Sequence, residues 1–118
     1  MLINKLKLNK QEKKAIKGFK KELNKELGEQ IVEIKLFGSK SRGDANKNSD
    51  IDILVVLKED SERNKDKVFD IVQSVLLEYE ILLSPVIFNK EEYDYLNNIP
   101  TIFMQNLKFE GISIWKNM

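Results

Sequence analysis

Two aspartates, Asp50 and Asp52, stand one residue apart at the start of a segment of β-branched residues and leucine that runs to Leu57. That composition is typical of a strand covered on both faces. Residues two apart in a strand point to the same face, so the Cβ atoms of the two aspartates lie about 7 Å apart. Because unpaired buried carboxylates are costly, the pair predicts a bound cation, and oxygen ligands favour Mg²⁺.

The polar stretch before this strand has residues that suit phosphate binding. Gly38 and Gly43 free the backbone to curl closely around a ligand. Ser39 begins a turn whose N–H groups and hydroxyl can hold phosphate oxygens, and Lys40 and Arg42 add positive charge nearby. A phosphate cradle next to a metal-binding pair predicts a nucleoside triphosphate as ligand.

Plainer interpretations of the same residues stay open. The two aspartates can form a solvated strand start, paired with Arg42 or Lys47. The glycines are also compatible with ordinary turns. Arg42 can hold the loop through a salt bridge as readily as it can contact phosphate.

The amino-acid composition excludes several kinds of covalent link, metal site and catalytic residue. The chain has 118 residues and contains neither cysteine nor histidine, which excludes disulfides, zinc-thiolate sites and catalysis by histidine or cysteine. No apolar run approaches the length of a membrane span and no signal-peptide pattern is visible, so we expect a cytoplasmic protein that does not bind membranes.

Positive charge is concentrated near the N-terminus. Residues 1–30 hold nine lysines and four glutamates, although the whole chain has a formal net charge of only +1. A lysine-rich helix can contact nucleic acid or an acidic partner. We favour a solvated helix face, because lysine fills exposed helices by propensity, and therefore expect no direct nucleic-acid binding.

The first half of the chain must position the candidate site from a helix and a strand. Asn9 and Glu12 have capping-box spacing, and apolar residues then recur at helical intervals until Gly28. Residues 31–37 alternate, which predicts a half-exposed strand with Val32 on the same face as Ile34 and Leu36.

The second half predicts a further helix and strand, then shorter elements. Asp60 and Ser61 cap a helix whose expected core positions are Val68, Ile71, Val72, Val75, Leu76 and Tyr79. Residues 81–88 form an apolar strand in which Pro85 indicates a sheet edge or a bulge. Short helices at 90–96 and 101–110 and a small strand at 112–115 complete an α+β (mixed α/β) fold with one small mixed sheet flanked by helices.

The glycine-serine turn and the aspartate pair together resemble the signature of the polymerase-beta-like nucleotidyltransferase superfamily. The whole chain resembles its minimal nucleotidyltransferase (MNT) members. That pattern is a strand ending in glycine-serine, an Arg-Gly shortly after, and Ser-Asp-x-Asp at the start of the next strand. The matching positions here are Gly38, Ser39, Arg42, Gly43, Ser49, Asp50 and Asp52.

The resemblance implies a single nucleotidyltransferase domain over residues 1–118. It implies that Gly38, Ser39, Arg42, Gly43 and Ser49 bind the nucleotide, and that Asp50 and Asp52 are catalytic and bind Mg²⁺. The implied reaction moves AMP from ATP to an acceptor hydroxyl. The acceptor can be a protein, a small molecule or an RNA end. Similar MNT proteins act as antitoxins beside a HEPN-type RNase toxin, so such a partner is one candidate for the acceptor. The alternative is a weak or inactive antitoxin that neutralises the toxin by binding.

One position departs from the family pattern. Active members carry a third carboxylate on the strand after the second helix, and here Ser84 stands near that place, in a strand without Asp or Glu. Glu80 is four residues earlier, about 13 Å away along a strand, so we expect it not to substitute. This departure weakens the expectation of turnover more than that of nucleotide binding.

Overall fold

A four-stranded mixed sheet lies at the centre of the protein. The structure, a computed structural model, describes residues 8–38 and 50–116, with the side chains of residues 109, 110 and 116 excepted. The strands are β1 (Ile31–Phe37), β2 (Ile51–Leu57), β3 (Leu83–Asn89) and β4 (Ile112–Lys116), in the order β3-β2-β1-β4. β1 is antiparallel to both of its neighbours, whereas β2 and β3 are parallel.

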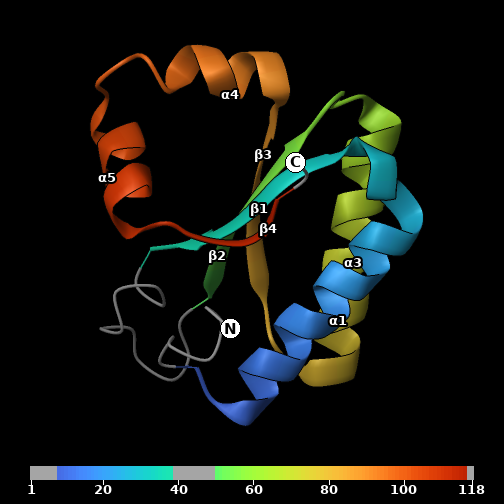
Figure 1. Cartoon of the computed structure of the whole chain (residues 1–118). Coiled ribbons are helices and arrows are strands. Elements are labelled where there is room, and N and C mark those ends of the chain that lie inside the picture. Colours follow the sequence, from blue (N-terminus) through green and yellow to red (C-terminus); the bar gives the residue numbers. More distant parts are fainter. Residues whose placement is uncertain (1–7, 39–49, 117–118) are drawn as a thin grey trace.

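Helices lie on both faces of the sheet (Figure 1). The helices α1 (Lys10–Leu27) and α3 (Glu62–Tyr79) pack on one face, and a 3₁₀ turn, η2 (Gly28–Gln30), leads from α1 into β1. The short helices α4 (Lys90–Leu96) and α5 (Ile102–Glu110) lie on the other face. The predicted α+β architecture and the order of its elements are therefore confirmed.

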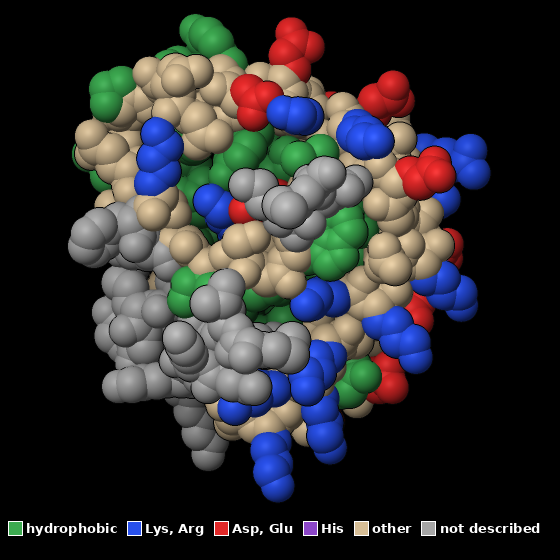
Figure 2. All heavy atoms as spheres, viewed as in Figure 1, with side chains coloured by type: hydrophobic (Ala, Val, Ile, Leu, Met, Phe, Trp, Pro, Cys, Tyr) green, Lys and Arg blue, Asp and Glu red, His purple; other side chains and the backbone are tan. Residues whose placement is uncertain are grey.

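The predicted capping box is present at the start of α1. The Asn9 side chain accepts a hydrogen bond from the Glu12 backbone N–H at 2.8 Å, and the Glu12 carboxylate accepts one from the Asn9 N–H at 3.0 Å. Together they satisfy two N–H groups that a helix start leaves without partners. The outward side of α1 carries exposed lysines: Lys14, Lys17, Lys21 and Lys25. Figure 2 shows basic side chains gathered where α1 lies.

β1 differs from the predicted half-exposed strand because a bulge interrupts it. The register shifts between Ile31 and Glu33, so Ile31 packs with Ile34 and Leu36 in the larger core while Val32 packs against the smaller one. The expectation that Val32 shares a face with Ile34 was wrong. An extra residue in one strand reverses the alternation on either side of it.

The second half of the chain follows the prediction with small corrections. Ser61 caps α3 by accepting from the Asn64 N–H at 3.2 Å. Leu76, expected in the core, is 39% exposed, whereas Val68 and Val75 are buried as predicted. β3 begins at Leu83 rather than at residue 81, and it is an edge strand, as Pro85 indicated.

The smaller core determines how the second face of the sheet is covered. Leu54 and Val56 of β2 contact Tyr93 of α4 and Met104 and Leu107 of α5. The predicted turn region of residues 39–49 lies outside the described residues. No helix in the part of the chain that the structure describes is both long and apolar enough to cross a membrane.

Replacing Phe19 with alanine should lower the free energy of unfolding by about 3–5 kcal/mol, because it removes a fully buried aromatic ring from the larger core. Phe69→Ala is the matched control, since Phe69 is 50% exposed on α3, and it should cost about 1 kcal/mol or less. Urea unfolding of both variants measures the difference. Equal losses would contradict this placement of α1.

Candidate functional site

The candidate residues meet at one end of the sheet. β1 ends at Phe37, directly before Gly38, and β2 and β3 both begin at this end because β1 is antiparallel to β2 and β2 is parallel to β3. Phe37 is paired with Asp52, and Asp52 is paired with Ser84 on the next strand. Three separate segments thus bring Gly38, Asp52 and Ser84 together.

Asp52 lies against the backbone of Gly38. Ile51 and Ile53 belong to the larger core, so alternation places Asp52 on the opposite face, with Leu54 and Val56. Gly38 has φ of +78°, and a Cβ atom added there would lie 2.2 Å from Asp52 Oδ2. Only glycine combines this left-handed conformation with so close an approach.

A hydrogen bond from Ser84 holds the Asp50 side chain near Asp52. Its hydroxyl donates a hydrogen bond to Asp50 Oδ2 at 3.1 Å. Because Ser84 stands opposite Asp52 in the parallel ladder, this bond holds the carboxylate of Asp50 beside that of Asp52. Asp50 itself precedes β2 and is exposed, so its free lone pairs can be reached from solvent.

These side chains offer an oxygen-only donor set. Two carboxylates and a hydroxyl are hard ligands, which suit Mg²⁺ and not the softer transition metals. No group of three or more acidic, histidine or cysteine side chains that could hold a metal occurs within residues 8–38 and 50–116. Two carboxylates are nevertheless enough for Mg²⁺, which usually keeps several waters and binds substrate phosphates.

The remaining residues that the sequence analysis considered for the site fall into three groups: some are not described, one lies beside the aspartates, and one lies off the sheet. Ser39, Arg42, Gly43 and Ser49 lie outside the described residues. Ser84 is beside the aspartates, where the third carboxylate was expected. Glu80 is no part of β3: it ends α3 in a left-handed conformation with φ of 58°, so it is not on the sheet.

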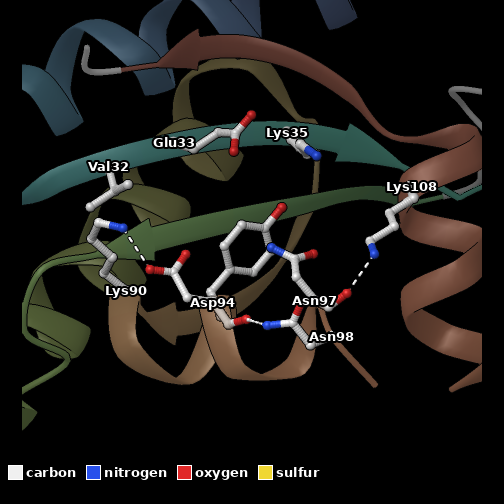
Figure 3. A pocket seen from close by; sticks show the side chains of 9 residues that line it. Val32, Glu33, Lys35, Lys90, Asp94, Asn97, Asn98 and Lys108 are labelled. Atoms are coloured by element: carbon white, nitrogen blue, oxygen red, sulfur yellow. Dashed lines mark hydrogen bonds and ion pairs between the residues drawn. The ribbon is translucent and has the colours of Figure 1, made fainter. Parts of the chain in front are cut away.

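Two features of this face were not predicted from the sequence. The first is the bond from Ser84 to Asp50, which depends on pairing between strands far apart in the chain. The second is a cavity of about 520 Å³ between β1 and the helices α4 and α5, with Glu33 and Lys35 on its floor (Figure 3). The alternation of these two residues had suggested a solvent-facing strand.

A family model described as a nucleotidyltransferase domain matches residues 16–109, which include both aspartates and most of the elements around them. A protein of Methanocaldococcus jannaschii, named as a candidate protein adenylyltransferase, is 34% identical over 100 residues. That alignment covers 84% of this chain and 94% of the relative.

Solved structures share the fold. One is a chain in a toxin-antitoxin structure with AMP-PNP, with a TM-score of 0.57 and 22% identity over 85% of this chain and 73% of that one. Another is a spectinomycin adenyltransferase of Enterococcus faecialis with ATP and spectinomycin, with a TM-score of 0.64 and 19% identity over 89% and 56%.

Replacing Gly38 with alanine should lower the free energy of unfolding by about 1–3 kcal/mol, because alanine is strained at this φ and its methyl group would push Asp52 aside. Gly28→Ala is the matched control. Gly28 has φ of −44°, and the nearest atom to an added methyl is the end of the Asn24 side chain. Urea unfolding should therefore show little change for Gly28→Ala. A fully stable Gly38→Ala protein would contradict the close contact.

Proposed function

The chain belongs to the nucleotidyltransferase domain family and is a nucleotidyltransferase, and on that premise we propose that it moves AMP from ATP to a hydroxyl group of a partner protein. The observation that supports this most is the meeting of Gly38, Asp50 and Asp52 at one end of the sheet. Such a site can grip a triphosphate through backbone groups and a cation through carboxylates.

The chain's own residues contribute mainly position and charge. Asp50 and Asp52 would hold Mg²⁺, which supplies positive charge to the triphosphate and the departing pyrophosphate. Gly38 allows the backbone after β1 to approach the phosphates, and the proposed role of Ser39, Arg42, Gly43 and Ser49 is to surround them. Ser84 holds Asp50 in its orientation.

The proposed step forms one bond and breaks another. The acceptor oxygen attacks the α-phosphorus, the bond from that phosphorus to the bridging oxygen breaks, and pyrophosphate leaves. The hydroxyl proton passes to water. Because phosphoryl-type transfer depends chiefly on alignment and charge stabilisation, the reaction can proceed without a dedicated base, at a reduced rate.

A protein acceptor is supported by the names of relatives. The related archaeal protein is named for adenylyl transfer to protein, and a chain of similar fold comes from a toxin-antitoxin pair. We propose that the acceptor lies on a HEPN-type toxin encoded beside this protein, and that both act in the cytoplasm, where ATP is available.

A second candidate is an antitoxin that neutralises its partner by binding alone. The serine at position 84, in place of an acid, favours this possibility, because two carboxylates hold the metal less tightly than three. Intact mass of the partner, after incubation with ATP and Mg²⁺, distinguishes the two: transfer adds the mass of one or more AMP groups, and occlusion adds none.

The double variant Asp50→Asn, Asp52→Asn should lose Mg²⁺-dependent ATP binding by about tenfold or more, because the charge that holds the ion is removed. Calorimetry with ATP and Mg²⁺, and again with EDTA, measures the effect. A matched control is Asp66→Asn, Asp70→Asn on α3, where both residues are exposed. Equal affinities in all three proteins would remove the proposed metal role.

Replacing Ser84 with aspartate should raise Mg²⁺ affinity several-fold, and with it the rate of transfer to a confirmed acceptor, because a third carboxylate then faces the ion. Ser84→Asn has nearly the same shape without the charge and serves as the control. Mg²⁺ titration by calorimetry gives a readout that does not depend on turnover. If Mg²⁺ binds Ser84→Asp no better than Ser84→Asn, position 84 does not limit the site.

A further inference from the structure

Four large apolar side chains are exposed along α3 and the segment that joins it to β3: Phe69, Leu76, Leu77 and Leu82. We call them the α3 apolar surface. Leu77 is 83% exposed and Leu82 is 44% exposed. The other large apolar side chains that are exposed within residues 8–38 and 50–116 belong to α4 and α5. Exposed apolar side chains gathered on one element indicate an interaction site, whereas single scattered ones do not.

The α3 apolar surface extends to the aspartates. Only residues 80–82 connect α3 with β3, so the last turn of α3 lies at the end of the sheet where β2 and β3 begin (Figure 1). The Leu82 carbonyl oxygen accepts a hydrogen bond from the Ile51 N–H at 3.1 Å. Because Ile51 is paired with Leu83, Leu82 stands opposite Asp50, one step earlier. A macromolecule that brings a hydroxyl group to Asp50 is therefore placed beside this surface.

The charges around the α3 apolar surface have one sign. Residues 68–80 contain three acidic residues, Asp70, Glu78 and Glu80, and neither lysine nor arginine. All three are exposed, and none forms an ion pair with any residue that the structure describes. A partner that covers this surface therefore gains most if lysine or arginine flanks its own apolar residues.

A second copy of this chain does not offer that combination. If two copies met through the same surface, the carboxylates of one would approach those of the other, because such a contact is symmetric. The outward side of α1 has the opposite charge, but the large apolar side chains of α1 are buried in the core. The chemistry of the surface accordingly favours a different protein over self-association.

We propose that the α3 apolar surface binds the acceptor protein, through a helix whose apolar side chains are flanked by lysine or arginine. A helix suits the surface because Phe69, Leu76 and Leu77 have the spacing through which one helix packs on another. The bound protein reaches the aspartates past Leu82. This inference rests on the proposed function, because it names the surface that holds the acceptor during transfer.

The double variant Leu77→Ser, Leu82→Ser tests the surface, with the protein encoded beside this one as the probe. Calorimetry without ATP should show an affinity for that protein reduced about tenfold or more, because apolar contact area is lost. In transfer assays the KM for that protein should rise similarly, while kcat and ATP affinity stay within about twofold. Ile102→Ser, 77% exposed on α5, is the matched control and should change none of these values.

A charge reversal gives an independent measurement that keeps the leucines. The double variant Asp70→Lys, Glu78→Lys should bind the neighbouring protein about fivefold more weakly or worse at low salt, because like charges then face each other. High NaCl should reduce the difference from the wild-type protein, since salt screens exposed charges. Glu26→Lys, Glu29→Lys has the same change in charge at exposed positions away from the surface and should bind like the wild-type protein.

Unchanged affinity in both double variants would overturn the inference. Sedimentation would also overturn it by showing that the wild-type protein forms a dimer which Leu77→Ser, Leu82→Ser abolishes, because a second copy would then occupy the surface.

Failure of the proposed function gives a different result. If the variants weaken binding but intact mass shows no AMP on the wild-type partner complex, the docking surface stands and the transfer reaction does not. If every variant transfers AMP at an unchanged KM, the reaction stands and the docking surface does not. A neighbouring protein that neither binds nor gains AMP would contradict both.

Discussion

The close approach of the Gly38 backbone to the Asp52 carboxylate is the constraint on which the rest of the site depends. It requires β1 to end beside the start of β2, and it requires a residue without Cβ in a left-handed conformation at that point. The sheet pairing supplies the first requirement, because Phe37 and Asp52 are register partners. α1 and α3 stabilise that pairing by burying the larger core against one face. Packing on one side of the sheet thus fixes the geometry on the other.

Ser84 stands where the family pattern has a carboxylate, and it holds Asp50 in place through a hydrogen bond without adding a negative charge. An acid at this position would bring a third negative charge to the pair. The serine instead donates a hydrogen bond to Asp50 and needs no cation to be satisfied. The site is therefore ordered without a third carboxylate.

Much of the fold could be predicted from local patterns. The capping box at Asn9 and the edge position of Pro85 are consequences of backbone hydrogen bonding, which a few neighbouring residues determine. Val32 was misplaced because a bulge reversed the alternation in β1. Leu76 was misplaced because it lies beside, and not on, the side of α3 through which Val75 and Tyr79 pack against the larger core. The aspartate pair was visible in the sequence, but the bond from Ser84 and the cavity above Glu33 arise from segments that meet only after folding.

The outer strand of the sheet restricts how this protein can associate with others. β3 forms one border of the sheet, and Pro85 in its interior offers no N–H group to a neighbouring chain. Strand addition along this border would leave a gap in the hydrogen-bond ladder. Recognition at this border is accordingly more favourable through side chains than through a shared β-sheet, and the same gap protects the exposed border against uncontrolled fibre growth.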